Sequence, residues 1–277
     1  MVSYGTRRTI STIAVHGILI TACLGVLFPL IWILRTSFAH RVIAYRIPPE
    51  WFFQPTWDNY VMIFKNHPFH LFFANSLIVA LVSTLVCLII GAPAAYSFSR
   101  FRTGGNAVRV SVLTTQMLPA ITLVIPFFLM FRWVGLHNTR TGLALTYITF
   151  NIPFIIWILI GFFEGIPREL DESAMIDGCT RFSSFVRVIV PISLPGMLSA
   201  GVFSFVLCWN EFLFALILTG KKSKTLPVAV SALITQQGTE IGAVCAATML
   251  IIVPMILLYF GFRRFLIKGM VAGAVKE

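Results

Sequence analysis

Charge is scarce in this chain of 277 residues: charged residues make up 11% of it, whereas hydrophobic residues make up 58%. Soluble domains are about a quarter charged and about half apolar, so the composition excludes an ordinary soluble globule. The apolar residues are gathered in runs of about twenty, and a helix of that length crosses a hydrocarbon core about 30 Å thick. We therefore expect an all-α membrane protein.

The chain also lacks the short motifs of several enzymes and metal sites. Lys221 and Lys222 follow Gly220, but no glycine stands at position 215, so the phosphate-binding pattern G-x-x-x-x-G-K is absent. No H-E-x-x-H pattern occurs, and a proline follows His67 in the only H-x-x-H spacing. The cysteines show no C-x-x-C spacing. We expect no enzymatic activity, no cofactor bound by this chain and no metal site.

Acidic residues are fewer than basic ones, which gives a formal net charge of +11. The lysines and arginines are scattered along the chain rather than clustered on one element, so the excess does not indicate a nucleic-acid partner. In a membrane protein such an excess sets topology and contacts anionic headgroups. We expect membrane lipid as a partner and no nucleic acid.

Apolar runs predict six transmembrane helices in a single domain covering residues 1–277. We place them at about 13–34, 75–97, 109–131, 142–163, 194–219 and 243–262. With six crossings both termini lie on one side, and a small excess of Lys and Arg in the segments on that side favours the cytoplasm. The first run follows Arg7 and Arg8 but has no A-x-A cleavage site, so we expect it to remain as a transmembrane helix.

The most informative segment is the polar loop between the fourth and fifth runs, at about 164–192. Pro167 stands where a helix begins, acidic side chains fill its first turns, and Gly178 follows its last helical residue. Proline at the start, acids near the positive end of the dipole and glycine past the end are typical helix boundaries. A second short helix is predicted at about 181–190, ended by Pro191. We therefore expect a compact helix-turn-helix.

One face of the second short helix is apolar, formed by Phe182, Phe185, Val186 and Ile189. Two interpretations follow from this amphipathic pattern. The loop inserts into a groove of a partner protein, or it lies on the headgroups with its phenylalanines buried and its charges solvated.

This loop resembles the EAA loop of ABC-importer permeases. The residues that match in type and spacing are Glu172, Ala174, Asp177, Gly178 and Pro191. The resemblance implies that the loop docks on a cytoplasmic ATPase, which favours the partner-groove interpretation. Glu172 and Asp177 are then expected to contact the ATPase, and Gly178 to shape the turn. Phe182 and Phe185 are expected to pack the loop.

Further strings extend the resemblance over nearly the whole chain, and they are most similar to carbohydrate-uptake permeases such as the smaller permease of the maltose transporter. They include Asp58-Asn59-Tyr60, the run from Ala94 to Phe101, Met117-Leu118-Pro119 and Trp209-Asn210-Glu211-Phe212. The family implies a permease subunit in the bacterial or archaeal cytoplasmic membrane. It also implies a second permease, an ATPase dimer that holds ATP and Mg²⁺, an extracytoplasmic binding protein, and a sugar or oligosaccharide as substrate.

Glu211 is the one acid predicted inside a span. A carboxylate there is costly unless it is paired, hydrated or protonated, so it either faces the substrate pathway or holds a helix interface by hydrogen bonds. Asn210, Trp209 and Asn151 are candidates for the same two roles. Trp209 can stack on a sugar, but aromatic residues also pack against lipid and anchor spans.

Rival functions remain. A stand-alone secondary transporter or channel for a small polar solute would carry charges along several spans or an inverted repeat, and it would work without ATP. An export or signalling module with the same six-span layout would not depend on an external binding protein.

Overall fold

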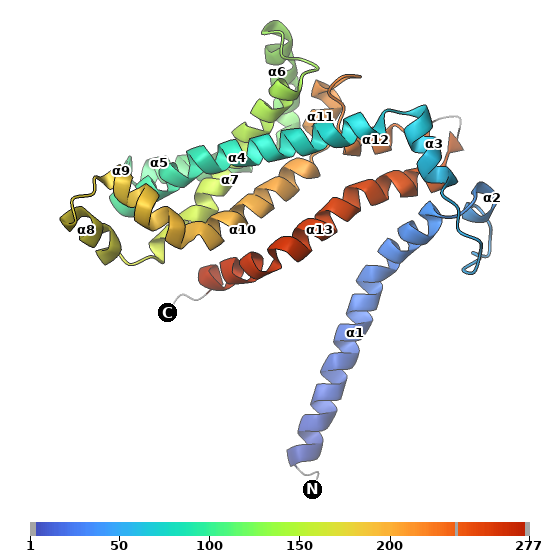
Figure 1. Ribbon diagram of the computed structural model, residues 1–277, viewed down its shortest axis with the longest axis horizontal. Helices are drawn as coiled ribbons and strands as arrows, with labels where there is room; N and C mark the ends of the chain where they lie inside the picture. Colours follow the sequence, from blue (N-terminus) through green and yellow to red (C-terminus); the bar gives the residue numbers. More distant parts are fainter. Residues whose placement is uncertain (1–3, 236–237, 275–277) are drawn as a thin grey trace. The chain divides into compact units, whose positions relative to one another are not determined.

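The computed structural model describes residues 4–235 and 238–274, and it is helical over most of that length (Figure 1). The helical class predicted from composition is confirmed. The elements run in the order α1 (Tyr4–Ser37), α2 (Arg41–Ala44), α3 (Asp58–Asn66), α4 (Phe69–Phe101), α5 (Gly105–Thr114), η1 (Thr115–Met117), α6 (Ala120–Trp133), α7 (Arg140–Glu164), α8 (Glu169–Ile176), α9 (Arg181–Ser184), the π-helical turn η2 (Phe185–Ile189), α10 (Val190–Trp209), α11 (Leu213–Leu218), α12 (Leu226–Ser231), the antiparallel two-residue strands β1 (Ile234–Thr235) and β2 (Gly238–Thr239), and α13 (Ile241–Ala274).

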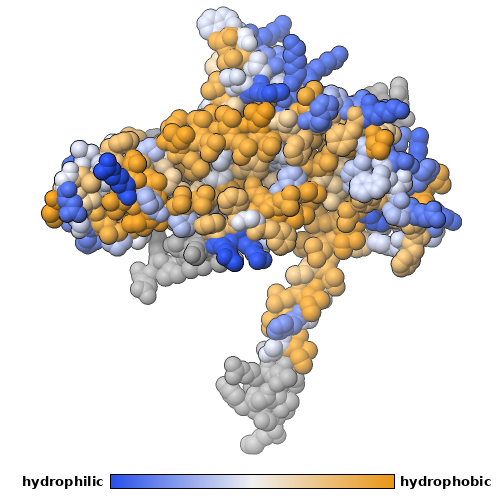
Figure 2. Space-filling view, viewed as in Figure 1, coloured by the Kyte–Doolittle hydropathy of each residue, from blue (hydrophilic) through white to orange (hydrophobic). Residues whose placement is uncertain are grey.

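Two compact units make up the described chain. The smaller contains the residues up to Pro68 together with Val230–Ile252, and the larger contains Phe69–Ala229 together with the chain from Val253 onward. In Figure 2 apolar side chains cover the visible surface of α1 and of α4, as expected for helices whose solvent is lipid.

The larger unit is built on three long helices, α4, α7 and α10, that pack on one another. Small residues let their backbones approach closely. A Cβ added at Gly91 of α4 would lie 2.6 Å from Ile155 of α7, and one at Gly196 of α10 would lie 2.5 Å from Phe162 of α7. Both contacts are too short for a real side chain, so these glycines set the helix spacing.

The third predicted span, 109–131, falls on a bent pair of helices rather than on one straight helix. Two segments, Gly105–Met117 and Ala120–Trp133, are together apolar enough to cross a membrane but meet at 91°. The break follows from Pro119, which caps α6 and restricts Leu118 to an extended backbone (φ −70°, ψ 125°). In the described residues, five other helices are long and apolar enough to cross.

The structure differs from two further predictions, the fifth span at 194–219 and the short helix at 181–190, which form one helix with other ends. A single helical stretch runs from Arg181 to Trp209, so Pro191 does not end a helix. In the turn η2 the N–H of Val190 bonds to the carbonyl of Phe185, five residues earlier, and this π-type register accommodates a proline that has no N–H of its own. At the other end the helix stops at Trp209, before α11.

In the smaller unit, α1 and α3 are held together by the buried Asn59. Its side-chain amide donates to the carbonyls of Ser37 (2.9 Å) and Ala39 (2.8 Å), which close the end of α1. A Cβ added at Gly242, at the start of α13, would lie 2.5 Å from the Asn59 amide oxygen. Arg41 and Glu240 form an ion pair at 3.2 Å on the surface.

Candidate functional site

The loop that follows α7 is a sharp turn between α8 and α9, closed by backbone hydrogen bonds. Gly178 has φ +86°, a left-handed conformation that favours glycine. The N–H of Gly178 donates to the Met175 carbonyl (3.1 Å), and that of Cys179 donates to the Ala174 carbonyl (2.9 Å), the pattern of a Schellman motif. Thr180 then caps α9 by accepting from the N–H of Ser183 (3.2 Å). The turn is therefore set by local chemistry.

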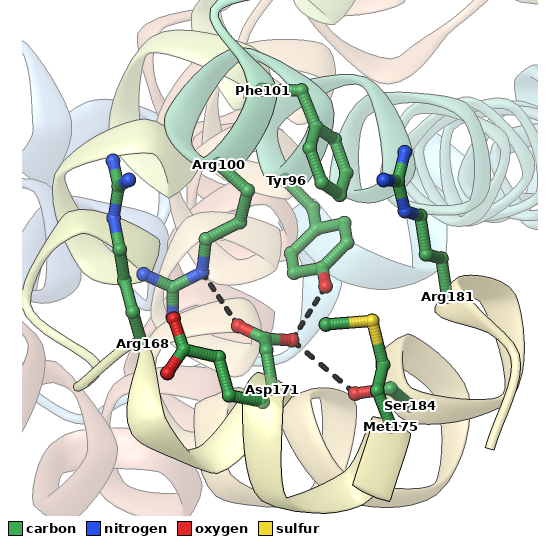
Figure 3. Close-up of a pocket in the computed structure, with 9 residues that line it drawn as sticks. Tyr96, Arg100, Phe101, Arg168, Asp171, Met175, Arg181 and Ser184 are labelled. Carbon is green, nitrogen blue, oxygen red and sulfur yellow. Dashed lines mark hydrogen bonds and ion pairs between the residues drawn. The ribbon is translucent and has the colours of Figure 1, made fainter. Parts of the chain in front are cut away.

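One carboxylate of α8, that of Asp171, points into the protein, and the residue is only 7% exposed. Tyr96 Oη donates to its Oδ1 (2.5 Å), and Ser184 Oγ donates to the same oxygen (3.3 Å). Arg100 Nε lies 2.8 Å from Oδ2 in an ion pair whose side chains are 5% and 11% exposed. Figure 3 shows Tyr96 and Arg100, both from the end of α4, converging on Asp171 with Ser184 of α9 opposite. The carboxylate thus joins α4, α8 and α9.

Apolar packing reinforces this polar junction. The ring of Tyr96 lies 4.8 Å from that of Phe185 and 5.9 Å from that of Phe163, measured between centroids. Phe185, Phe163 and Ile189 belong to the same buried cluster that fills the space between α4, α7 and α10. Arg100 also donates to the carbonyl of Ile166 (2.8 Å), just before α8. The loop is consequently fixed to the helix core on one side.

The other side of the loop is open and carries both apolar and acidic groups. Phe182 is 74% exposed and Ile176 is 86% exposed. Glu172 and Asp177 are exposed beside them, as is Glu169. Arg168, Arg181 and Arg187 are exposed in the same segment, so the open side presents large apolar side chains flanked by charges of both signs. A face of this kind is suited to a partner surface of matching shape and complementary charge.

A pocket of about 130 Å³ opens where the loop meets the end of α4. Arg100, Arg168 and Arg181 line it together with Asp171 and Glu172, and the guanidinium of Arg181 lies 4.9 Å from the ring centre of Phe101 (Figure 3). The described residues contain no group of three or more His, Cys, Asp or Glu placed to hold a metal ion.

The residues singled out in the loop divide between the two sides. Ala174 and Phe185 are buried, whereas Glu172, Asp177, Gly178, Phe182 and Pro191 are exposed. The predicted apolar face of the second short helix therefore does not form as one surface. The structure turns Phe185 and Ile189 into the core and leaves Phe182 and Val186 outside. The expectation that Phe182 packs the loop is wrong for this chain by itself.

The pathway candidates separate in the same way. Trp209 and Asn151 are buried among α4, α7 and α10, where the Asn151 amide donates to the Tyr147 carbonyl (2.9 Å) and contacts Cys208 Sγ (3.4 Å). Asn210 is exposed in the break after α10. Asn151 thus makes contacts inside the subunit.

Glu211 lies in that break rather than inside a span. Its Oε1 accepts from the N–H of Phe214 (2.9 Å), and its Oε2 accepts from the N–H of Ala215 (3.1 Å) and from Tyr147 Oη (2.9 Å). These bonds satisfy N–H groups of the first turn of α11, so the carboxylate starts a new helix where the sequence predicts a continuous one. It also ties that helix to α7.

Sequence reasoning missed Asp171, Tyr96 and Arg100 as a unit. Asp171 reads as one of several acids in a first helical turn, and Arg100 reads as a topology charge at a span end. A usable signal was present: Tyr96 and Arg100 are four residues apart, and hence on one face of a helix, at the end of an apolar run.

The family described as "Binding-protein-dependent transport system inner membrane component" matches residues 87–271, well over half of the chain. The chain belongs to this family. It is a permease subunit of an ABC importer and a multi-pass membrane protein, and the stand-alone transporter is not favoured.

Curated relatives and solved structures agree with this assignment. The sulfoquinovosyl glycerol transport system permease SmoH of Agrobacterium fabrum is 37% identical over 253 residues, covering 90% of this chain and 89% of the relative. The trehalose transport system permease SugB of Mycobacterium tuberculosis is 35% identical over 256 residues, covering 90% and 92%. A subunit of a bacterial ABC transporter involved in alginate import has the same fold, with a TM-score of 0.78 at 22% identity over 95% of this chain and 98% of that one.

Proposed function

We propose that this permease forms half of a translocation pathway for a sugar or oligosaccharide and couples it to a separate ATPase through residues 168–190. A second permease supplies the other half, and an ATPase dimer binds ATP and Mg²⁺. An extracytoplasmic binding protein delivers the substrate. The chain acts as one transmembrane domain with both termini in the cytoplasm, and it binds no cofactor or metal itself.

The observation that carries the coupling role is the two-sided build of the α8–α9 loop. Asp171 and Phe185 attach one side to the helix core, while Ile176 and Phe182 leave the other side apolar and exposed. Adjacent exposed apolar side chains of this kind mark a surface that contacts another protein or a membrane. Its acids, Glu172 and Asp177, favour a partner with basic residues around a groove.

Transmission of force follows from the attachment. When ATP closes the ATPase dimer, the docked loop moves with the ATPase surface. The Asp171 junction carries that displacement to the end of α4, and the continuous helix from Arg181 carries it into α10. The pathway is thereby switched between inward-open and outward-open states by a difference in contact energy between the two states.

The sugar substrate is supported by the names of the relatives. Those at 33–37% identity include permeases of trehalose, sulfoquinovosyl glycerol and diacetylchitobiose systems. One solved relative was crystallised with an alginate pentasaccharide-bound periplasmic protein. All of these are carbohydrates or glycosides with many hydroxyl groups, so a polyhydroxylated solute is the class we assign.

Co-purification of the native complex tests the coupling role. The tagged chain is extracted gently from its own membrane beside an Asp177→Arg version and a matched control, Asp58→Arg, which changes another exposed acid, in α3. We expect the unmodified chain and the control to recover an ABC-type ATPase, and the Asp177→Arg version to lose it. Recovery of equal amounts of ATPase with all three chains would contradict a docking role for the loop.

A further inference from the structure

The smaller unit contains a short irregular stretch, residues 46–53, that runs back along α1. The ring of Trp51 lies 5.5 Å from that of Trp32 in an edge-to-face arrangement, and 6.3 Å from that of Phe28. Both partners belong to the apolar span Thr12–Ser37. The stretch therefore packs against a helix that crosses the membrane.

The depth of this contact along α1 can be judged from helix geometry. Thr12–Ser37 has 26 residues. At about 1.5 Å per residue it measures about 39 Å, roughly 9 Å more than a hydrocarbon core of about 30 Å. Phe28 lies about 13 Å before the end of the helix at Ser37 by the same rise. Even if the whole excess protrudes at that end, Phe28 stays at or inside the hydrocarbon boundary, and Trp51 lies beside it.

The most exposed side chains of this stretch are apolar. Ile47 is 93% exposed and Phe52 is 95% exposed. In water, exposure of these two apolar side chains would contribute no favourable free energy of burial. Beside a membrane-spanning helix they lie where aromatic and aliphatic residues enter the boundary between headgroups and acyl chains.

Several polar groups of the stretch are paired within the protein or absent, which lowers the cost of entry into that boundary. Pro48 and Pro49 have no N–H to leave unpaired, and the Glu50 carbonyl accepts from the guanidinium of Arg35. The Glu50 carboxylate forms an ion pair with Arg46. Arg35 also lies over the ring of Phe53, 4.9 Å from its centre. Its charge is thereby shared with aromatic faces.

We propose that residues 46–53 form a second contact with the bilayer, in which Ile47, Trp51 and Phe52 enter the headgroup–acyl boundary on the side where α1 ends. Lipid is the occupant that fits because the stretch presents apolar side chains continuous with the spanning surface of α1 and uses its charges internally. The contact holds the end of α1 at a defined depth.

Fluorescence quenching in the reconstituted complex tests this inference. An environment-sensitive fluorescent amino acid is placed at position 52, and as a control at position 58, which is exposed at the start of α3. Each complex is measured in vesicles that contain nitroxide-labelled lipid, and separately with iodide in the water. We expect lipid-borne nitroxide to quench the probe at position 52 several-fold more than the control probe, and iodide to show the reverse order.

Two results would overturn the proposal. If iodide quenches both probes equally and nitroxide lipid quenches neither, the stretch lies in water. If the probe at position 52 is shielded from both quenchers only when the partner subunits are present, a protein covers it. Circular dichroism and thermal unfolding of each labelled complex establish that both are folded, and an aromatic probe replaces Phe52 at an exposed position where little packing is lost.

Discussion

Arg100 Nε lies 2.8 Å from Asp171 Oδ2, and the two side chains are almost completely buried. Arg100 comes from the end of α4, while Asp171 comes from the first turn of α8, more than seventy residues later in the chain. This ion pair, with the hydrogen bond from Tyr96, connects the polar loop to the helix core.

Removal of one member of this pair is the first prediction. Asp171→Ala leaves the Arg100 guanidinium buried without its partner, and we expect the free energy of unfolding to fall by about 3–5 kcal/mol. Replacement of both residues by apolar ones of similar size, Asp171→Leu with Arg100→Met, should cost less than the sum of the single changes. Thermal unfolding of the purified complex measures both, and additive effects would show that the two charges do not interact.

The two phenylalanines of the loop should behave differently. Phe185→Ala removes a buried ring and should destabilise the protein by about 3–5 kcal/mol. Phe182→Ala removes an exposed ring and should change stability by no more than about 0.5 kcal/mol. It should instead weaken association with the ATPase by about 1–3 kcal/mol if the ring is an interface anchor. Titration of the ATPase against the permease in detergent, beside thermal unfolding, distinguishes the two effects, and equal loss of stability in both variants would be the contrary result.

A β-branched residue at Gly178 should disturb the turn without preventing membrane insertion. Gly178→Val must adopt φ near +86°, which strains the backbone by about 1–3 kcal/mol. We expect insertion close to normal and ATP-driven uptake largely lost. Gly161→Ala is the control, because an added Cβ there meets nothing within 4 Å. Normal uptake by the Gly178 variant would remove the turn from the coupling mechanism.

We expect Glu211 to stabilise the fold rather than to contact the substrate. Glu211→Gln keeps the size of the side chain but replaces the charged carboxylate that accepts hydrogen bonds from two N–H groups and a phenol. We expect the free energy of unfolding to fall by about 1–3 kcal/mol. Tyr147→Phe removes one of these bonds, and the double variant should lose less than the two single losses combined. Uptake kinetics serve as the second readout. A raised KM at unchanged stability would instead place Glu211 in the pathway.

The local features of the site can be predicted from the sequence alone. The turn at Gly178 is predictable because glycine past a helix end has few other reasons to stand there, and the acids of α8 mark a helix start. Pro119 indicates a break near Leu118, but the sequence does not predict the bend of 91°. The strings quoted from the N-terminal half and the loop identify the family.

What sequence could not supply depends on residues distant along the chain. Asp171 resembles Glu169 and Glu172 in sequence, and only the approach of Tyr96 and Arg100 distinguishes it. The π-helical turn η2 places both Phe185 and Ile189 in the core. A regular helix pattern already predicts that these two residues share a face, but it gives no reason to expect the π-type hydrogen bond that lets the helix continue through Pro191. The capping role of Glu211 likewise requires the break between α10 and α11 to be known.

The unbroken helical stretch from Arg181 to Trp209 has 29 residues, which at about 1.5 Å per residue makes a rod about 43 Å long. One end of the rod begins in the exposed loop, and the other ends where Glu211 starts α11. A tilt of about 5° about the middle of such a rod moves each end by about 2 Å in opposite directions, without any side chain changing partner. If a partner displaces the loop, the movement reaches the far break through the stiffness of this one backbone, while the Asp171 junction is the separate route into α4.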